Sequence, residues 1–322
     1  MHSDSLLMVK GNMKRLVLIG ILLLSICSLK ANGQDSIRVE KWLNEAKALP
    51  KDSCRTLHFA KQMLGVSYVA GTLDENEEEQ LVVRTDALDC TTFVETVLAL
   101  CIADKRGERD FEGFKKAMTD VRYRDGILNG YTSRLHYFSD WIQNNEQMGF
   151  VKECTSETAC SQSKELWLDF MTTHVDSYLP LKNNPEFVME MAVHEKKWQD
   201  IVVAYIPKEK FNLSSDDLKI KNGDILVITT NIKGLDVVHV GFAFWRGGKL
   251  HLLHASSVAK KVIEDSLSLY EYSKNKKAHT GVRAVRVVFK RDVNEKRSEK
   301  NSTPFFLRYV LQFYFKVPAS AC

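Results

Sequence analysis

The sequence has little cysteine for its length, seven residues in 322, and no C-x-x-C pair. This scarcity excludes a disulfide-built scaffold and a structural zinc site of the finger type. Cys154 and Cys160 are close enough in sequence to form a disulfide in an oxidising compartment. Cys54 and Cys101 fall on apolar helical stripes, which predicts core positions for both.

The sequence also lacks a long apolar run and a strong excess of charge. Leu16 to Ile26 is about half the length that spans a bilayer, and it follows Met13-Lys14-Arg15. We therefore predict a signal peptide over residues 1–33, with residues 1–12 as an upstream extension. Its removal lowers the net charge from +4 to about +1, which predicts no nucleic-acid partner and no stable membrane span. The alternative is lipoprotein anchoring at Cys27.

No internal repeat is visible, and the rest of the chain is long enough for one large domain. Seven segments have helical spacing of apolar residues: Ser36–Ala48, Ser53–Leu64, Thr91–Ala103, Phe111–Met118, Leu135–Asn144, Glu165–Thr173 and Asn184–His194. Five later segments have strand composition: Ile201–Ile206, Asp224–Thr230, Val237–Trp245, Lys249–Ser256 and Gly281–Phe289. Helices first and strands later predict an α+β fold with an antiparallel sheet. The predicted domain covers 34–290, with a helical insert around 130–200 and a C-terminal tail over 291–322.

Cys90 is the most informative residue of the chain. Asp89 precedes it and is a good helix N-cap, so Cys90 falls at the first position of an apolar helix. Unpaired backbone N–H groups and the positive end of the helix favour a thiolate there. The negative charge of Asp89 opposes this effect, and we expect the helix terminus and a nearby histidine to outweigh it.

His239 and His254 are the candidates for that histidine. The link between their strands is Trp245-Arg246-Gly247-Gly248-Lys249, which predicts a hairpin with the two glycines at its tip. That turn places both imidazoles on one face as diagonal neighbours. A shift of one residue would replace His254 with His251 as the partner of His239.

Five segments, in order, resemble the NlpC/p60 superfamily of papain-like cell-wall hydrolases: residues 65–71 (GVSYVAG), 88–93 (LDCTTF), 222–226 (NGDIL), 239–242 (HVGF) and 253–256 (LHAS). Within it, residues 131–138 (YTSRLHYF) and 71–74 (GTLD) resemble the bacterial family numbered 1460 among domains of unknown function (DUF1460). The resemblance spans about residues 50 to 290. It implies a papain-like fold whose nucleophile helix packs on an antiparallel sheet.

The resemblance also implies N-acetylmuramoyl-L-alanine amidase activity, with peptidoglycan or its muropeptide fragments as the substrate. It implies Cys90 as nucleophile, His239 as general base and His254 as the residue that orients this base. The residues that it implies for the oxyanion or the substrate are Tyr68, Asp89, Arg134, His136 and Tyr137. Tyr137 and Trp141 lie four residues apart and are equally explained by packing. No metal or cofactor is implied, and we expect an exported monomer, periplasmic or secreted.

Three other functions remain open. A D,L-endopeptidase would use the same fold and chemistry but cut a peptide bond within the stem. A zinc hydrolase would coordinate its metal with Cys90, His239 and His254. A non-catalytic wall-binding protein would keep the fold without turnover. The insert between Gly130 and Ile201 is long enough to narrow the cleft, which favours small fragments over intact wall.

Overall fold

The computed structural model of the chain describes residues 33–76 and 78–289. The predicted signal peptide, the alternative lipid anchor at Cys27 and the C-terminal tail fall outside this part and stay predictions. No helix in the described ranges has both the length and the apolar character needed to cross a membrane.

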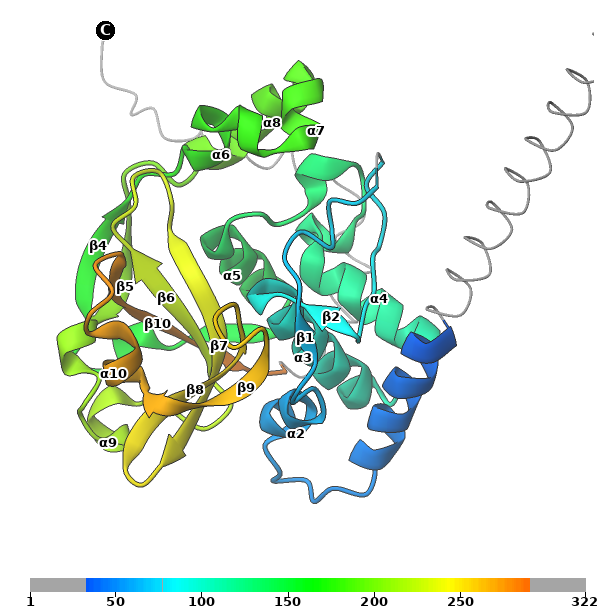
Figure 1. The fold of residues 1–322 in the computed structure, drawn as a ribbon, viewed down its shortest axis with the longest axis vertical. Coiled ribbons are helices and arrows are strands. Elements are labelled where there is room, and N and C mark those ends of the chain that lie inside the picture. Colours follow the sequence, from blue (N-terminus) through cyan, green and yellow to red (C-terminus); the bar gives the residue numbers. More distant parts are fainter. Residues whose placement is uncertain (1–32, 77, 290–322) are drawn as a thin grey trace, which may run out of the picture.

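Helices fill the first half of the described chain (Figure 1). The backbone is helical over 33–46, and further helices follow: α2 (Arg55–Gln62), α3 (Cys90–Arg106), α4 (Phe111–Arg122) and α5 (Phe138–Gln147). Each agrees with a predicted range to within a few residues. Further along the chain, α8 (Pro185–Lys196) begins as predicted, because the Asn184 side chain accepts a hydrogen bond from the Glu186 N–H.

The strands form a ten-stranded sheet in the order β2-β1-β9-β8-β7-β6-β10-β5-β4, and β3 pairs with β10 away from this path. Their bounds are β1 (Ser67–Tyr68), β2 (Ala87–Leu88), β3 (Val151–Glu153), β4 (Gln162–Leu166), β5 (Ile201–Pro207), β6 (Ile225–Thr230), β7 (Val237–Arg246), β8 (Lys249–Ser256), β9 (Lys261–Ser268) and β10 (His279–Val287). All pairs are antiparallel except β1 with β2. The predicted α+β fold with an antiparallel sheet is confirmed. The papain-like assignment stays a prediction.

The predicted helix over Glu165–Thr173 is wrong. Its first residues belong to β4, which pairs with β5, and only the single turn α6 (Phe170–Thr173) is helical. Leu166 and Leu168 are buried while Trp167 between them is exposed, which is the two-residue period of a strand. The insert is therefore mixed rather than helical.

The two faces of the sheet bury different residues. Phe242 and Leu253 face the helices, and Phe93 of α3 packs edge-on against Phe242 with ring centroids 5.5 Å apart. Ala243 and Leu252 lie on the opposite face, in a second core that includes residues of α9 (Ser215–Leu218) and α10 (Leu269–Ser273). This alternation fixes α3 against β7 and β8.

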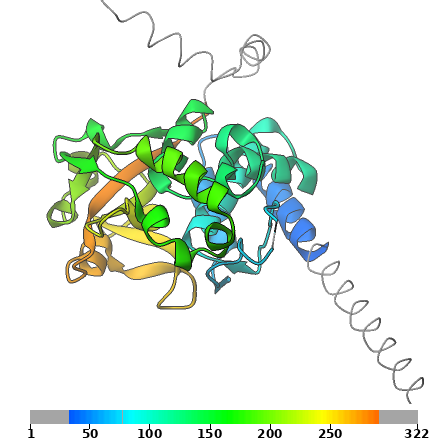
Figure 2. The same cartoon turned by 90° about the horizontal axis from the view of Figure 1, so that it is seen from above.

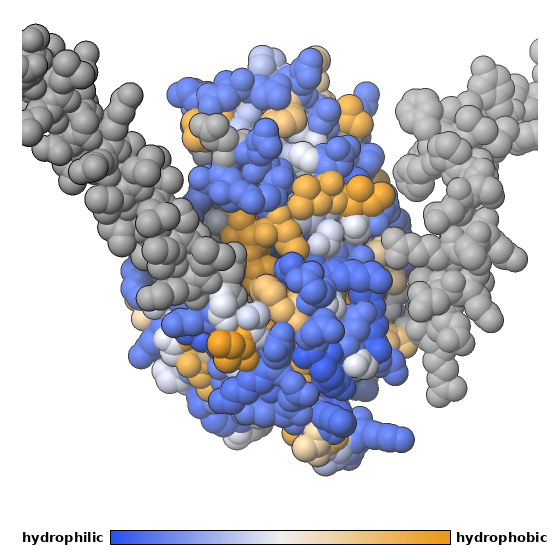
Figure 3. All heavy atoms as spheres, turned by 90° about the vertical axis from the view of Figure 1, so that its right-hand side faces the viewer, coloured by the Kyte–Doolittle hydropathy of each residue, from blue (hydrophilic) through white to orange (hydrophobic). Residues whose placement is uncertain are grey.

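A cap made of α6, α7 (Leu179–Asn183) and α8 stands beyond one end of the sheet and the ends of the helices (Figures 1 and 2). It has its own apolar cluster, which includes Tyr131, Leu168 and Met191. On the side of the molecule that Figure 3 faces, apolar residues form a band among polar ones. The cap therefore packs around an apolar cluster that is separate from the two cores of the sheet.

Candidate active site

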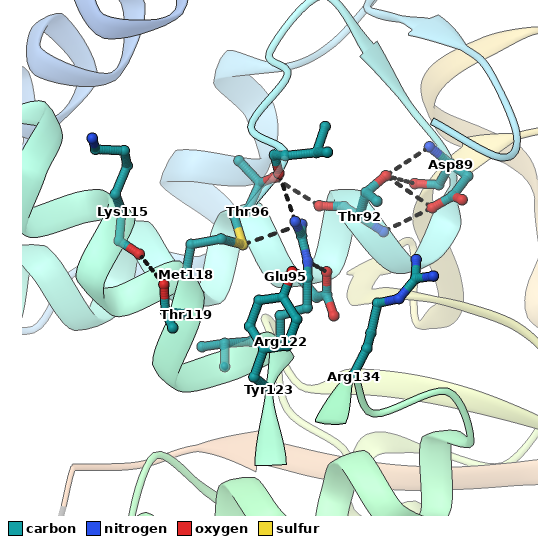
Figure 4. Close-up of polar contacts among 12 residues, drawn as sticks. Asp89, Thr92, Glu95, Thr96, Lys115, Met118, Thr119, Arg122, Tyr123 and Arg134 are labelled. Atoms are coloured by element: carbon teal, nitrogen blue, oxygen red, sulfur yellow. Dashed lines mark hydrogen bonds and ion pairs between the residues drawn. The ribbon is translucent and has the colours of Figure 1, made fainter. Parts of the chain in front are cut away.

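The N-terminus of α3 has the predicted geometry. The Thr92 N–H donates to Oδ1 of Asp89 at 2.8 Å, and the Asp89 N–H donates to Oγ1 of Thr92 at 2.9 Å (Figure 4). These reciprocal bonds form a capping box and make Cys90 the first helical residue. Cys90 is partly exposed as a residue.

The thiol of Cys90 is nevertheless not a thiolate at rest, and our expectation on this point is wrong. Burial of the sulfur and the neighbouring charge of Asp89 raise its pKa to about 11. Hydrogen bonds from the Val240 backbone and the Thr91 side chain act in the opposite direction but do not compensate. Cys90 would therefore act as a nucleophile only after a base removes this proton.

A buried ion pair joins α3 to α4. Nε of Arg122, at the end of α4, donates to Oε2 of Glu95 on α3 at 2.7 Å, and both side chains are 2% exposed. Arg122 also donates to the carbonyl oxygen of Val82 at 2.6 Å (Figure 4 shows the Arg122 side chain). Arg122 therefore connects α4 both to α3 and to the segment around Val82 that precedes Cys90.

The β7–β8 hairpin has the predicted register. Gly247 and Gly248 both have positive φ, as a type I′ turn requires, and Arg246 pairs with Lys249 across it. Nε2 of His239 lies 2.6 Å from Nδ1 of His254, with the two rings nearly perpendicular. The prediction that His239 and His254 share a face is confirmed.

His251 is excluded as the partner of His239. It pairs opposite Phe244, and the two rings stack with centroids 5.3 Å apart. Its Nδ1 lies 3.1 Å from the carbonyl oxygen of Asp265.

Cys90 packs in the same core as Val240, the residue that follows His239 on β7. The Val240 N–H that donates to the Cys90 sulfur belongs to the residue after His239. The β7–β8 pairing ends at Phe242 and Leu253, so Val240 pairs with Val227 of β6 on one side but with no residue of β8 on the other. Burial and the nearby His254 lower the pKa of His239 well below 6.5, so its imidazole is neutral at pH 7. A neutral imidazole is the form that can accept a proton.

Asp265 is a site residue that the sequence analysis missed. Its Oδ2 lies 3.3 Å from Nε2 of His254, although the contact is not aligned as a straight hydrogen bond. Burial alone would raise the pKa of Asp265, but the contacts with His254 and the Leu267 N–H outweigh it and lower the pKa. Asp265 lies on β9, which we did not predict. The β-branched Val262 and Ile263 after a short link were the available signal.

Tyr272 on α10 was also missed. Its ring centroid lies 5.5 Å from that of His254 and 6.1 Å from that of His239. The Lys276 ammonium lies 3.2 Å from the centre of the same ring. Burial and the charges of Asp265 and Cys90 raise the pKa of Tyr272, so its hydroxyl stays protonated.

Tyr68 lies on β1 beside the nucleophile. Burial raises the pKa of its hydroxyl, and the charges of Cys90 and Asp89 act in the same direction. Asp89 itself is engaged by the helix cap, where its Oδ1 accepts from both the N–H and the hydroxyl of Thr92.

Arg134 and His136 hold Tyr131 between them. The Arg134 guanidinium lies 5.0 Å from the centre of the Tyr131 ring and pairs with Asp74 and Glu79. Nε2 of His136 lies 2.9 Å from the Tyr131 carbonyl oxygen. Tyr131 in turn borders a hollow of about 290 Å³, lined also by Leu73, Asp74, Asn76, Glu78, Glu79, Gly130, Pro180 and Phe187. Arg134 and His136 therefore act on this hollow through Tyr131.

Tyr137 does not line a site, which corrects our expectation. Its side chain is 4% exposed, and its hydroxyl donates to Oε1 of Glu195 at 2.6 Å and accepts from the Met171 N–H. Trp141, one turn further along α5, is fully buried. Tyr137 packs in the cluster of the cap, and Trp141 packs in the main core.

The other cysteines also differ from expectation. Cys154 and Cys160 are free thiols, so the disulfide that we considered is absent. Cys101 is buried as predicted, but Cys54 is exposed because it stands at the N-cap of α2 rather than on its inner face.

The geometry does not favour the zinc alternative. Within residues 33–76 and 78–289, no group of three or more His, Cys, Asp or Glu side chains is arranged to hold a metal ion. Nε2 of His239 and Nδ1 of His254 face each other instead of converging on a common point.

Comparison with known proteins identifies the family of this chain. A family model described as N-acetylmuramoyl-L-alanine amidase-like (AmiA-like) matches residues 58–282. The crystal structure of an N-acetylmuramoyl-L-alanine amidase from Bacteroides uniformis is 40% identical, with a TM-score of 0.68 over 73% of this chain and 97% of that one. No curated protein matches.

Two further structures are similar. One from Bacteroides fragilis, which bears a provisional xylanase name, is 42% identical with a TM-score of 0.67 over 72% of this chain and all of that one. One from Legionella pneumophila, assigned to DUF1460, is 24% identical with a TM-score of 0.62 over 81% and 97%, which shows a shared fold. The family match includes the nucleophile helix, the hairpin and β9. The chain belongs to the N-acetylmuramoyl-L-alanine amidase-like family.

Proposed function

We propose that the protein hydrolyses the amide bond between the muramoyl lactyl group and L-alanine in peptidoglycan fragments, with Cys90 as the nucleophile. The observation that carries this proposal is the His239–His254 contact of 2.6 Å on β7 and β8, the strands against which α3 packs with Cys90 as its first residue. A thiol, a neutral imidazole and a group that orients the imidazole are the parts that cysteine amidases need. We also assign the fold to the papain-like NlpC/p60 superfamily.

In the first step, the ring nitrogen of His239 that does not face His254 takes the thiol proton while the sulfur attacks the lactyl carbonyl carbon. The backbone N–H of Cys90, unpaired at the helix start, and the Tyr68 hydroxyl stabilise the oxyanion. The imidazolium then protonates the leaving nitrogen of alanine, so the C–N bond breaks and a thioester remains. Water, deprotonated by His239, hydrolyses the thioester and restores the thiol.

The cap supports a preference for small soluble fragments over intact wall. It covers one end of the sheet, and the hollow beside Tyr131 lies between residues of the 73–79 segment and residues of the cap, Pro180 and Phe187. A hollow of this size suits one or two sugar or peptide units rather than a long polymer. Such fragments occur outside the cytoplasm, in agreement with the predicted signal peptide, and we propose that the protein works there as a monomer.

A glycosidase, as the name of the Bacteroides fragilis structure implies for that protein, is the competing function. Glycosidases use two carboxyl groups across the scissile bond. Of the carboxylates at this site, Asp89 caps the helix and Asp265 contacts His254. Both are engaged in supporting Cys90 and the imidazoles, which favours the amidase.

The test uses defined muropeptides and analysis of the products by mass spectrometry. We expect free sugar and an intact stem peptide, and complete loss of turnover in Cys90→Ala. Cys54→Ala, which removes an exposed thiol on α2, is the matched control and should keep full activity. A clipped stem would indicate a D,L-endopeptidase, and cleavage of xylan would indicate the glycosidase. Residual turnover in Cys90→Ala would overturn the assignment, and equal turnover of intact sacculi would overturn the fragment preference.

A further inference from the structure

We propose that Asp265 is a positioning residue that sets the tautomers of both imidazoles, so that His239 presents an unprotonated nitrogen to Cys90. This inference rests on the proposed function and adds a fourth member to the site. The four residues come from four separate elements, α3, β7, β8 and β9, and three of them, His239, His254 and Asp265, form a series of contacts that ends at the carboxylate.

The structure holds Asp265 in place on both sides of its side chain. Its Oδ1 accepts a hydrogen bond from the Leu267 N–H at 2.9 Å, which leaves Oδ2 directed at His254. Its carbonyl oxygen lies 3.2 Å from Nη2 of Arg246 and 3.1 Å from Nδ1 of His251. His251, which we considered as a partner of His239, thus anchors the backbone of Asp265 instead.

The donors and acceptors determine where each proton lies. An ionised Asp265 accepts only, and its Oδ2 lies 3.3 Å from Nε2 of His254, so its charge favours the tautomer of His254 with the proton on Nε2. Nδ1 of a neutral His254 is then an acceptor, and the 2.6 Å contact requires the proton on Nε2 of His239. Nδ1 of His239 is left unprotonated and free to take the thiol proton. When it does so, the carboxylate stabilises the positive charge shared by the two rings.

Burial matters because this series of contacts is largely removed from water. His254 is 1% exposed, so its interaction with a carboxylate is weakly screened. The titratable or charged groups that face the series from the surrounding elements are Cys90 on α3, Arg246 on β7, His251 on β8, Tyr272 on α10, Lys276 in the link after α10, and His279 on β10. Lys276 is the cation among them whose charge acts on both Asp265 and His239. Asp265 is thus the carboxylate that balances it.

The variant that tests the proposal is Asp265→Asn in the full chain. Glu264→Gln is the matched control, because Glu264 is the preceding residue of β9, faces the other way and pairs with Lys61 at 3.0 Å. The first readout is alkylation of Cys90 by iodoacetamide, followed at pH 7 and pH 11 by mass spectrometry of the Cys90 peptide. The exposed Cys54 serves as an internal reference thiol.

At pH 7 the reaction of Cys90 depends on proton transfer to His239, whereas at pH 11 hydroxide removes the proton directly. We expect Asp265→Asn to lower the alkylation rate at pH 7 by about 10- to 100-fold and to leave the rate at pH 11 unchanged. With muropeptide substrate, kcat should fall by a similar factor while KM stays within about twofold. Glu264→Gln should match the wild type in every measurement. An unchanged rate at pH 7, or an equal decrease at both pH values, would overturn the proposal.

A second measurement needs no variant. Nitrogen NMR of histidine-labelled wild-type protein should show both His239 and His254 with the proton on Nε2. A proton on Nδ1 of either ring would contradict the inference even if Asp265→Asn does not fold. Neither alkylation nor NMR requires a substrate. Failure of the amidase assignment, seen as activity in Cys90→Ala, is therefore distinguishable from failure of the role of Asp265.

Discussion

Loss of Arg122 should destabilise the protein strongly, although this residue does not touch the thiol. Arg122→Met keeps most of the side-chain volume but removes the charge that pairs with Glu95. It also removes the donor to the Val82 carbonyl oxygen. In this variant the Glu95 carboxylate and the Val82 carbonyl oxygen both lack the partner that Arg122 provides.

The magnitude follows from the burial of the pair. Breaking a buried ion pair by removing one partner costs about 3–5 kcal/mol, because the remaining charge stays buried. Both side chains are 2% exposed, so water cannot compensate for the loss. Against a typical total stability of about 5–15 kcal/mol, the variant should be marginally folded.

The loss of stability in Arg122→Met should also depend on pH. Burial raises the pKa of Glu95 above its ordinary value of 4.5, and Arg122 acts against this rise. Without Arg122 the pKa rises further, so the folded variant binds a proton more tightly than the unfolded chain. The stability of Arg122→Met should therefore increase relative to the wild type as the pH falls toward 4.5. The slope has a limit of about 1.4 kcal/mol per pH unit.

Urea unfolding followed by circular dichroism, at pH 7 and pH 5, measures both effects. The double variant Glu95→Gln/Arg122→Met removes both charges and should regain at least half of the lost stability at pH 7. A loss below about 1 kcal/mol in the single variant, or a double variant no more stable than the single one, would refute the reasoning.

Two further predictions concern the site itself. A Cβ on Gly241 would lie 2.8 Å from Cβ of His254 and from the Leu253 carbonyl oxygen, so Gly241→Ala should displace His254. We expect this variant to lose about 1–3 kcal/mol of stability and its kcat to fall more than tenfold. The control Gly247→Ala, at the open turn, should keep its kcat, and equal activities of the two variants would contradict the role of this close approach. Because burial and the nearby His254 lower the pKa of His239 well below 6.5, the acid limb of kcat/KM should lie below pH 6.5. A limb at or above pH 6.5 would show that His239 is not the base.

The position of Cys90 at the start of α3 and the hairpin register were predictable because both depend on contacts close in sequence. The Asp89 side chain reaches only to Thr92, so the start of α3 is specified within four residues. Gly247 and Gly248 fix the turn, and the turn fixes which residues of β7 and β8 face each other. Signals of this kind depend on residues that are neighbours in the sequence, so the sequence alone predicts them.

Other features depend on residues that only the fold brings together. Asp265 reaches His254 through the pairing of β9 with β8, and the burial that raises the pKa of Cys90 comes from the packing of α3 on the sheet. The strand β4 forms because β5, 35 residues further along from Leu166 to Ile201, offers it an edge. The sequence by itself determined where the thiol and the two imidazoles stand on their own elements. The tertiary structure decided how acidic the thiol is and which carboxylate supports its base, because desolvation and charge interactions depend on distance in space and not on distance along the chain.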